Sequence, residues 1–144
     1  MPDEQSYSTP KAASPVGAYP HARRVGSLLF LSGIGPREPK TNNIPGLELD
    51  ANGNIMEYDI EAQVHSMFRN VKAVLEAAGA KWDQLVDITV FLTNMKDDFP
   101  IFNKLYADTF AGPDKPNPTR TTIEINGLPT PIAVELKVIA WCPG

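Results

Sequence analysis

The sequence predicts one α+β domain, in which two helices pack on one face of a mixed β-sheet. Three observations predict this class. The 144 residues, of which 42% are hydrophobic and 21% are charged, fit a single core of ordinary globular composition. Two segments carry apolar residues at helical spacing, and five shorter segments have the apolar runs or the alternation of strands. Their order along the chain is strand, strand, loop, helix, strand, helix, strand, strand.

The charge and the rare reactive residues exclude several classes of protein. A net charge of -4, with Arg23–Arg24 as the longest basic run, leaves no broad positive surface for a nucleic acid or an anionic membrane. His21 and His65 lack the spacing of metal ligands, and the single Cys142 has no disulfide partner. No apolar run reaches the roughly 18 residues of a membrane span, and no leader opens the chain. We expect a cytoplasmic protein that uses no metal and no cofactor.

The N-terminal part of the chain contains the first two predicted strands. Residues 1–12 are polar and contain proline, so we expect them to form a loose arm. The two strands meet at Val25–Ser27, and the second, Leu28–Leu31, is an unbroken apolar run that is typical of a strand covered on both faces. Gly33 and Gly35 end this strand.

A long loop and the clearest helix follow. Residues 36–57 are rich in turn residues and have no sustained period, and loops of this length inside a domain are often functional or disordered. Within this loop, "DANGN" predicts a tight turn. Asp59 is the expected N-cap of a helix that ends at Gly79. The apolar stripe of this helix consists of Ile60, Val64, Phe68, Val71, Leu75 and Ala78.

Another strand and the second helix come next. The strand, within residues 85–94, places one apolar face at period two: Val86, Ile88, Val90 and Leu92. Asp97 or Asp98 is the expected N-cap of the helix, which puts Pro100 in the first turn, where its missing N–H costs nothing. The buried stripe of the second helix consists of Phe99, Phe102, Leu105, Tyr106 and Phe110.

The last two strands, within residues 117–141, read as a hairpin that turns at residues 127–131. In that register Arg120 faces Val138, and Glu135 lies on the other face of the hairpin from Arg120. A single bulge reverses this relation, and periodicity leaves the point open. The final strand is apolar on both sides, whereas two helices cover only one face of a sheet. We therefore expect the chain to associate with copies of itself.

Two charges stand in these apolar strands, and each allows two interpretations. Arg120 either reaches water, Glu124 or Asp114 from the strand end, or it clamps a carboxylate, which a planar guanidinium matches with two parallel hydrogen bonds. Glu135 must be exposed, paired or protonated, because an unpaired buried carboxylate is costly. It is either a partner in an ion pair or a general acid–base group whose pKa is raised by desolvation.

Three further polar residues are candidates for ligand binding. Ser32 precedes Gly33 at the end of an apolar strand, which indicates either an anion site or a simple strand end. The side chains of Tyr19 and Asn103 can each form a hydrogen bond, either with a ligand or with a loop of the protein. The residue patterns therefore predict a small self-associating α+β protein with a candidate carboxylate-binding pocket, and they predict no more than this.

Seven segments, in their order along the chain, resemble the reactive-intermediate deaminase family (Rid, also called YjgF). They are "PVGAYPHA", "FLSGIGP", "NVKAVLEAAGA", "VDITVFLTNM", "FNKLYADTF", "PTRTTIEINGLP" and "VELKVIA". The resemblance runs from about Ala13 to Trp141, within one domain of residues 1–144. It implies a chorismate-mutase-like α+β fold and a homotrimer, or a hexamer of paired trimers, whose sheets form a central barrel-like core. It also implies active sites in the clefts between subunits.

The resemblance implies roles for individual residues as well. Arg120 matches the family's carboxylate-binding arginine, and Glu135 matches the acid that positions the attacking water. Thr122 stands where many members have cysteine, so reactivity that depends on that thiol is expected to be absent. Lys137 replaces a common second glutamate. The expected substrate-binding positions are Arg120, Tyr19, Ser32, Gly33, Asn103 and Thr122.

A narrower resemblance concerns the substrate. The loop 36–57 and "YSTPKAASPVGAYPHARR" resemble the 2-aminomuconate deaminases of aromatic-compound catabolism. The implied reaction hydrolyses the enamine of 2-aminomuconate to 2-oxo-3-hexenedioate (4-oxalocrotonate) and ammonia. It needs no cofactor, because the imine tautomer of the substrate is itself electrophilic. A dicarboxylate also needs a second cation, for which the candidates are Arg37, Lys40, Arg23 and Arg24.

Three other functions are open at this point. The nearest is a broad-range 2-imino-acid deaminase of the same family that removes reactive enamines and imines. A different class is a protein that binds a small carboxylate without turning it over. RNA cleavage, which is sometimes ascribed to relatives, fits poorly with the acidic charge and with the lack of a histidine near Arg120.

Overall fold

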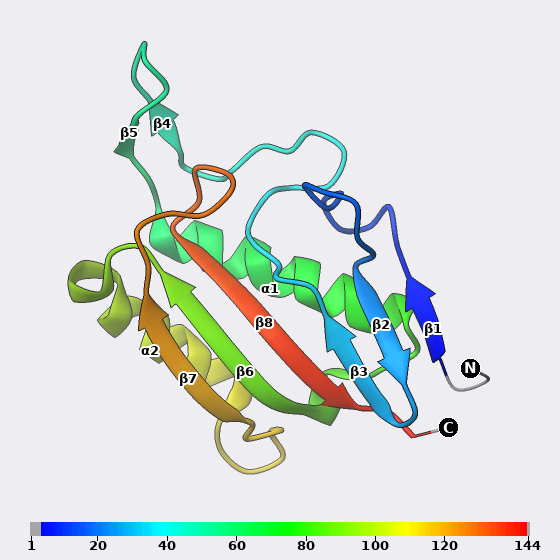
Figure 1. Cartoon of the computed structure of the whole chain (residues 1–144). Helices are drawn as coiled ribbons and strands as arrows, with labels where there is room; N and C mark the ends of the chain where they lie inside the picture. The colour runs from blue at the N-terminus through cyan, green and yellow to red at the C-terminus, as the bar shows by residue number, and fades with distance from the viewer. Residues whose placement is uncertain (1–3, 144) are drawn as a thin grey trace.

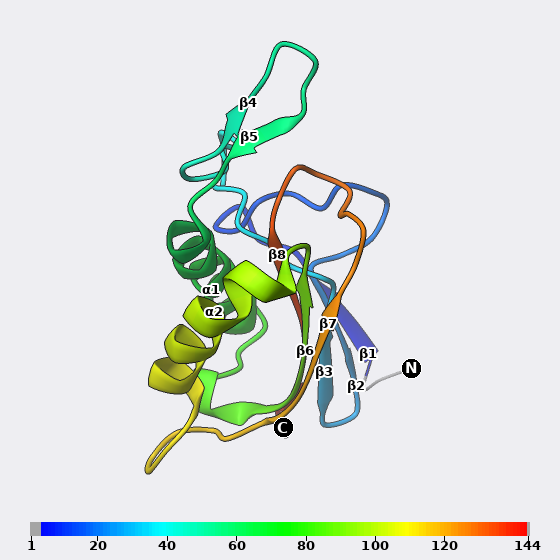
Figure 2. The ribbon, with the colours of Figure 1, turned by 90° about the vertical axis from the view of Figure 1, so that its left-hand side faces the viewer.

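The computed structural model describes residues 4–143 of the chain. One six-stranded mixed sheet, in the order β1-β2-β3-β8-β6-β7, carries two helices, α1 (Ile60–Ala77) and α2 (Met95–Phe110) (Figure 1). Figure 2 shows from the side that both helices lie on one face of the sheet. The predicted α+β class is thus confirmed. The strands of the sheet are β1 (Glu4–Tyr7), β2 (Ala22–Val25), β3 (Leu28–Leu31), β6 (Leu85–Leu92), β7 (Thr119–Glu124) and β8 (Val134–Trp141).

The hydrophobic core lies between the sheet and the two helices. α1 begins after Asp59, whose carboxylate accepts a hydrogen bond from the Ala62 N–H, as predicted for its N-cap. Phe68 of α1 meets Phe110 of α2 edge to face, with ring centroids 5.2 Å apart. Trp82, in the short 3-10 helix η1 (Trp82–Gln84), stacks on Phe110 at 5.0 Å. These rings join the two helices at one end of the core.

The last two strands do not pair with each other, so the predicted hairpin is wrong. β7 pairs with one edge of β6 in parallel, and β8 pairs with the other edge of β6 in antiparallel fashion. α2 supplies the crossover that a parallel β6–β7 pair requires. Residues 125–133 then carry the chain past the end of β6 to β8, and this connection is longer than the roughly two to five residues of a hairpin loop.

One residue of β6 lies on the other face from the one predicted. The register between β6 and β8 shifts between Leu85 and Asp87, which is a β-bulge. Leu85 is therefore buried, whereas Val86 is 42% exposed. Ile88 and the following alternate residues of β6 are buried as predicted.

α2 begins earlier than predicted. Asn94 is its N-cap, and the Asn94 side chain accepts a hydrogen bond from the Asp97 N–H. Asp97 and Asp98 consequently lie inside the first turn, and Pro100 is the sixth helical residue rather than a first-turn residue. Residues 94–98 contain three residues that can cap a helix, Asn94, Asp97 and Asp98. The position of β6 selects the N-cap among these three residues. β6 ends at Leu92, so the chain turns into the helix at Asn94, before it reaches Asp97 or Asp98.

Residues 4–7 belong to the sheet, which corrects the expected loose arm of residues 1–12; residues 1–3 lie outside the described part of the chain. β1 pairs with β2 in antiparallel fashion, and the His21 N–H donates to the Tyr7 carbonyl at 3.0 Å. Glu4 forms an ion pair with Arg23 across the two strands. The side chains of this edge strand are largely polar, which explains why hydrophobic periodicity did not predict it.

The loop 36–57 contains a small hairpin of β4 (Glu48–Leu49) and β5 (Ile55–Glu57) that projects beyond the body of the molecule (Figures 1 and 2). The predicted tight turn is confirmed between its strands. The Asp50 carboxylate accepts hydrogen bonds from the Asn52 and Asn54 N–H groups, both at 2.8 Å. These hydrogen bonds, that of Asn54 foremost, lower the pKa of Asp50.

The sheet face opposite the helices is open and exposes several large apolar side chains. Trp141 of β8 is 54% exposed and lies opposite Leu28 of β3, which is 41% exposed. Ile123 of β7 is 39% exposed on the same face. No helix within residues 4–143 covers this face, and none of them is long and apolar enough to cross a membrane. An open face with exposed large apolar side chains is typical of a surface that another protein surface covers.

We predict that the protein is a homotrimer, or a multiple of one, because association of copies buries this face. Trp141→Lys places a charge on the face and should shift the sedimentation coefficient toward that of a monomer. Met56→Lys is the matched control, because Met56 is 67% exposed on the projecting hairpin, and it should sediment as the wild type does. A wild-type chain that sediments as a stable monomer at micromolar concentration contradicts the prediction.

Candidate active site

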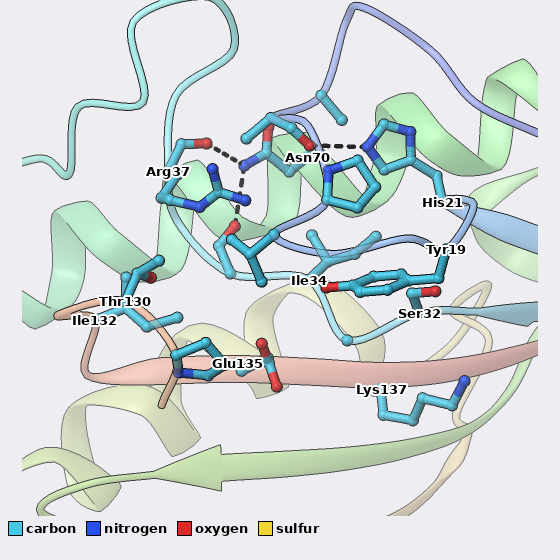
Figure 3. Close-up of a pocket in the computed structure, with 17 residues that line it drawn as sticks. Tyr19, His21, Ser32, Ile34, Arg37, Asn70, Thr130, Ile132, Glu135 and Lys137 are labelled. Atoms are coloured by element: carbon cyan, nitrogen blue, oxygen red, sulfur yellow. Dashed lines mark hydrogen bonds between the residues drawn. The ribbon is translucent and has the colours of Figure 1, made fainter. Parts of the chain in front are cut away.

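A pocket of about 410 Å³ opens where β3 ends beside β8 (Figure 3). Its walls come from residues 12–21, 32–37 and 129–132 and from the start of β8. We call it the Glu135 pocket. Four of the predicted site residues line it: Tyr19, Ser32, Gly33 and Glu135.

A bulge at the end of β3 shapes this pocket. The ladder between β3 and β8 pairs Phe30 with Ile139, and it resumes with Ile34 opposite Leu136, so the β3 side holds one extra residue. Two backbone hydrogen bonds between Ile34 and Leu136, at 2.8 and 2.9 Å, close the bulge. The extra residue frees residues 32–33 from the ladder and turns them toward the pocket, as bulges beside active sites commonly do.

The carboxylate of Glu135 lies against the backbone of Gly33. A Cβ atom at position 33 would lie 2.8 Å from Glu135 Oε2, so any other residue there would displace the carboxylate. Within residues 4–143, no group forms a hydrogen bond or an ion pair with Glu135, and burial raises the pKa of its carboxyl above the ordinary value of 4.5. Among residues 4–143, Glu135 therefore has no partner for the ion-pair interpretation. A desolvated, unpaired carboxyl has the properties of a general acid–base group.

Ser32 and Tyr19 present hydroxyl groups to the pocket. Ser32 Oγ donates to the Pro20 carbonyl at 2.7 Å, and the Ser32 N–H donates to the His21 carbonyl at 2.9 Å. The Ser32 oxygen is therefore fixed in place and is left with lone pairs that can accept a hydrogen bond. Tyr19 is 43% exposed, and Figure 3 shows its hydroxyl pointing into the pocket.

His21 lines the pocket, but both of its ring nitrogens are occupied. Nδ1 accepts from the Thr9 N–H at 3.1 Å, which leaves Nε2 to donate to the Ala13 carbonyl at 2.8 Å. These bonds fasten residues 9–13 over the pocket. His21 is therefore a structural residue of the wall. Within residues 4–143, no group of three or more His, Cys, Asp or Glu side chains is placed to hold a metal ion.

α1 holds two walls of the pocket through polar side chains that sequence reasoning missed. Gln63 Oε1 accepts from the Ala133 N–H at 2.8 Å. Ser66 Oγ donates to the carbonyl of residue 36 at 2.7 Å, and Asn70 Nδ2 donates to those of residues 35 and 37 at 2.9 and 2.7 Å. All three side chains are buried. Their spacing of three and four residues puts them on one face of the helix, and this polar stripe was the signal that could have found them.

Lys137 is a second charged residue of β8 that lines the pocket, and it was not predicted as a site residue. It follows Glu135 by two residues and so lies on the same face of the strand. Its Nζ donates to the Leu31 carbonyl, in the bulged stretch of β3, and burial lowers the pKa of the amine.

The other predicted site residues, Arg120, Thr122 and Asn103, do not line this pocket. Arg120 stacks over two rings of α2, at 4.6 Å from the centroid of Tyr106 and 5.7 Å from that of Phe99. Asn103 lies on the same side of α2 as these rings, by its helical spacing. Within the described residues, Thr122 Oγ1 and Tyr106 Oη are buried without a hydrogen-bond partner. We call these five residues the Arg120 cluster.

The register of the sheet explains why the two groups do not meet within one chain. Arg120 lies opposite Ile88 of β6, and Glu135 lies opposite Phe91, three residues further along. Side chains alternate along a strand, so an odd separation places them on opposite faces. Arg120 therefore lies on the helix side of the sheet, and Glu135 lies on the open side. The hydrophobic periodicity had left open whether Arg120 and Glu135 share a face, and the strand register shows that they do not.

The raised pKa of Glu135 predicts how stability depends on pH. The folded protein holds this proton more tightly than the unfolded chain, so the contribution to stability is fully present below the ordinary pKa of 4.5 and is lost as pH rises through the raised pKa. Glu135→Gln removes this dependence. Thermal melts should show the variant at least as stable as the wild type at about pH 8, with the advantage gone at about pH 4. A variant that is clearly less stable at the higher pH would mean that Glu135 has a structural partner.

Comparison with known proteins relates these features to a family. Residues 9–142 match the family model described as Endoribonuclease L-PSP. The RutC family protein SSO3206 of Saccharolobus solfataricus is 39% identical, over 92% of this chain and 93% of its own. A 2-iminobutanoate/2-iminopropanoate deaminase of Dermatophagoides farinae is 34% identical, over 96% and 97%. The crystal structure of a Rid family protein, YyfA from Yersinia pestis, matches with a TM-score of 0.81 at 33% identity, over 96% and 98%. The chain therefore belongs to the Rid (YjgF) family, as its sequence motifs predicted.

Proposed function

We propose that this protein is a cofactor-independent deaminase that hydrolyses 2-imino acids and their enamine tautomers to 2-oxo acids and ammonia. The observation that carries the proposal is Glu135, an unpaired and partly buried carboxyl in a pocket that also presents the Tyr19 and Ser32 hydroxyls. The Dermatophagoides farinae relative, 34% identical, is named for this chemistry. The reaction balances as R–C(=NH)–COO⁻ + H₂O → R–C(=O)–COO⁻ + NH₃, and it consumes no oxidant or reductant.

We further propose that copies of the chain assemble so that the Arg120 cluster of one copy closes the Glu135 pocket of another. Two observations support this arrangement. Within the described residues, Arg120 has no carboxylate partner within ion-pair distance, and the Tyr106 and Thr122 hydroxyls beside it have no hydrogen-bond partner. The sheet face on which Glu135 lies also exposes Trp141 and Leu28, and no helix of residues 4–143 covers it. In one chain the sheet register places Arg120 and Glu135 on opposite faces, so a second copy must supply the Arg120 that faces Glu135.

In this assembly Arg120 grips the carboxylate next to the imine carbon. Its two parallel N–H groups fix the distance and the orientation of that carbon relative to Glu135, and such positioning lowers the barrier without any covalent step. The Tyr106 and Phe99 rings hold the guanidinium by cation–π contact, which reduces its freedom before the substrate arrives. Thr122 offers a hydroxyl at the position where many members of the family are expected to have a cysteine thiol.

Glu135 then acts on water. Its carboxylate takes a proton from water as the water oxygen bonds to the carbon of the protonated imine, C=NH₂⁺, and the imine nitrogen thereby becomes the NH₂ group of a tetrahedral centre. The Tyr19 hydroxyl donates a hydrogen bond to that centre, and Ser32 Oγ accepts one from the nitrogen. When the carbon–nitrogen bond breaks, the protonated Glu135 returns its proton to the departing ammonia. The hydroxyl group of the tetrahedral centre releases its proton to solvent as the carbonyl forms, which replaces the proton that the imine took up. A pKa raised by burial suits a group that must both take and give a proton near neutral pH.

Within this class we propose 2-aminomuconate, with 2-oxo-3-hexenedioate as the product, as the narrower substrate. The feature that supports it is the rim of the Glu135 pocket, to which Arg37, the second residue of the long loop, contributes a cation. A general 2-imino-acid deaminase is the broader form of the same proposal. Steady-state rates with 2-aminomuconate and with 2-iminobutanoate compare the two directly. Tight binding of a 2-oxo acid, with no ammonia released from any imine, would instead indicate a carboxylate-binding protein.

Replacing Arg120 with lysine tests the clamp. We predict that Arg120→Lys lowers kcat/KM by about 10-fold or more and leaves the melting temperature near that of the wild type, because lysine keeps the charge but loses the two-pronged grip. Near-wild-type turnover with unchanged melting would rule out the clamp.

Replacing Glu135 with glutamine tests the base. We predict that Glu135→Gln lowers kcat by about 10² to 10⁴-fold while KM changes little, because Arg120 still holds the carboxylate. Ammonia release measures the rate. An active but destabilised variant would refute the catalytic role.

The two variants together test whether the site is shared. If Arg120 and Glu135 of different copies form one site, mixed oligomers of Arg120→Lys and Glu135→Gln chains contain about a quarter of intact sites and regain activity. If each site lies within one chain, the mixture stays as inactive as its parts.

A further inference from the structure

We propose that Arg37 is a second anion site of the Glu135 pocket, and that the pocket therefore takes imino acids that carry a second carboxylate. This inference rests on the proposed deaminase function and specifies its substrate class.

The guanidinium of Arg37 is held in place but carries an uncompensated charge. Its Nη1 donates to Asn42 Oδ1 at 2.9 Å, and its Nη2 donates to the Ser14 carbonyl at 2.5 Å. Both acceptors are neutral. Within residues 4–143, no carboxylate lies within ion-pair distance of Arg37. A guanidinium has five N–H donors, so several are left for a ligand.

The backbone that carries Arg37 is fastened to α1. Asn70 donates to the carbonyls of Gly35 and Arg37, and Ser66 donates to the carbonyl between them. Asn70 is 3% exposed and Ser66 is 2% exposed, so these hydrogen bonds are protected from water. Three consecutive carbonyls are thus fixed by one helix. A side chain on such a rigid base loses little conformational entropy when it binds a ligand.

The long loop completes this arrangement. Its first residues fold back in a turn, in which the Glu38 N–H donates to the Asn43 carbonyl at 2.8 Å and the Asn42 N–H donates to the Glu38 carbonyl at 3.0 Å. Asn42 has a φ of 61°, a left-handed conformation that asparagine tolerates well. The turn brings the Asn42 side chain back onto Arg37. The start of the loop therefore orients this guanidinium.

Arg37 and Glu135 lie on different sides of the same pocket (Figure 3). They carry opposite charges, yet they do not form an ion pair with each other. The pocket thus keeps a cation and a carboxyl apart across a ligand-sized space. A molecule that fits both places a carboxylate at Arg37 and its imine carbon near Glu135. Because Arg120 of the second copy serves the carboxylate next to the imine, the carboxylate at Arg37 is a different, distal one.

The other cations are less well placed. Arg23 pairs with Glu4, Arg24 donates to the Gly26 and Cys142 carbonyls, and neither lines the pocket. Lys40 is exposed in the loop and does not line the pocket either. Lys137 does line it, but its amine is engaged by the Leu31 carbonyl, and Figure 3 shows it at the other end of the pocket from Arg37.

The test compares substrates with one and two carboxylates on the same variants. 2-Iminobutanoate and 2-iminoglutarate, generated from their amino acids by an amino-acid oxidase, and 2-aminomuconate serve as substrates. We expect Arg37→Gln to lower kcat/KM for the two dicarboxylates by about 10- to 100-fold, mainly through KM, because a charge-assisted hydrogen bond is lost. The rate with 2-iminobutanoate should fall less than the rates with the dicarboxylates, since that substrate does not reach Arg37. Any loss it shows measures the hydrogen bond from Arg37 to the Ser14 carbonyl, which the variant also removes. Arg37→Lys should recover part of the loss, and Lys40→Gln is the matched control that changes neither rate.

Three outcomes overturn the proposal. They are an equal loss on all three substrates, no loss on any of them, or a selective loss of dicarboxylate activity in Lys137→Met but not in Arg37→Gln. If the wild type hydrolyses no imine at all, the proposed function fails and the anion site is tested by itself. Glutarate should then raise the melting temperature more than butyrate does, and Arg37→Gln should abolish the difference. An unchanged difference in that variant would overturn the anion site independently of catalysis.

Discussion

The two hydrogen bonds between Ile34 and Leu136 are the constraint on which the pocket depends. They return the chain to β8 after one extra residue, and so they convert a plain strand end into a bulge that faces a cavity. Because of the bulge, the backbone of Gly33 lies against the Glu135 carboxylate, and the Leu31 carbonyl is left to accept from Lys137. Without the bulge, residues 32–33 would pair regularly with β8, as residues 28–30 of β3 do. The shape of the pocket is thus a consequence of one shift in register.

The pocket collects charged groups and keeps them apart. Glu135 has no partner within the described residues, Arg37 bonds only neutral oxygens, and Lys137 bonds a carbonyl. Leaving charges unpaired in a partly buried space costs stability, because desolvation is not repaid by a neighbouring opposite charge. The same separation keeps the carboxyl poised to exchange protons and leaves the cations available to a ligand. The Arg120 cluster repeats this arrangement on the other face of the sheet. It holds a guanidinium on aromatic rings and two hydroxyls that have no hydrogen-bond partner among residues 4–143.

Much of the fold could be predicted from local sequence, because local physics decides it. The N-cap at Asp59, the apolar stripes of both helices and the tight turn at residues 50–54 follow from side chains that interact within a few positions. The motifs identified the family, and with it Tyr19 and Glu135 as members of one pocket. The start of α2 at Met95 was misplaced, since three possible capping residues within five positions leave the choice to the preceding strand.

The tertiary structure decided which strands are neighbours. Alternation of apolar residues predicts that a segment is a strand, but it does not predict which strand pairs with it. In the sheet, β6 lies between β7 and β8, the two strands that were predicted to form a hairpin. Bulges in β6 and after β3 depend on the register of the whole sheet and leave no mark in a period-two pattern. The polar stripe of α1 has meaning only once residues 35–37 lie beside it. The sequence alone determined that Arg120 and Glu135 are the unusual charges of this chain. Only the register across β6 decided that they stand on opposite faces, because strand pairing sums contacts that are far apart in sequence.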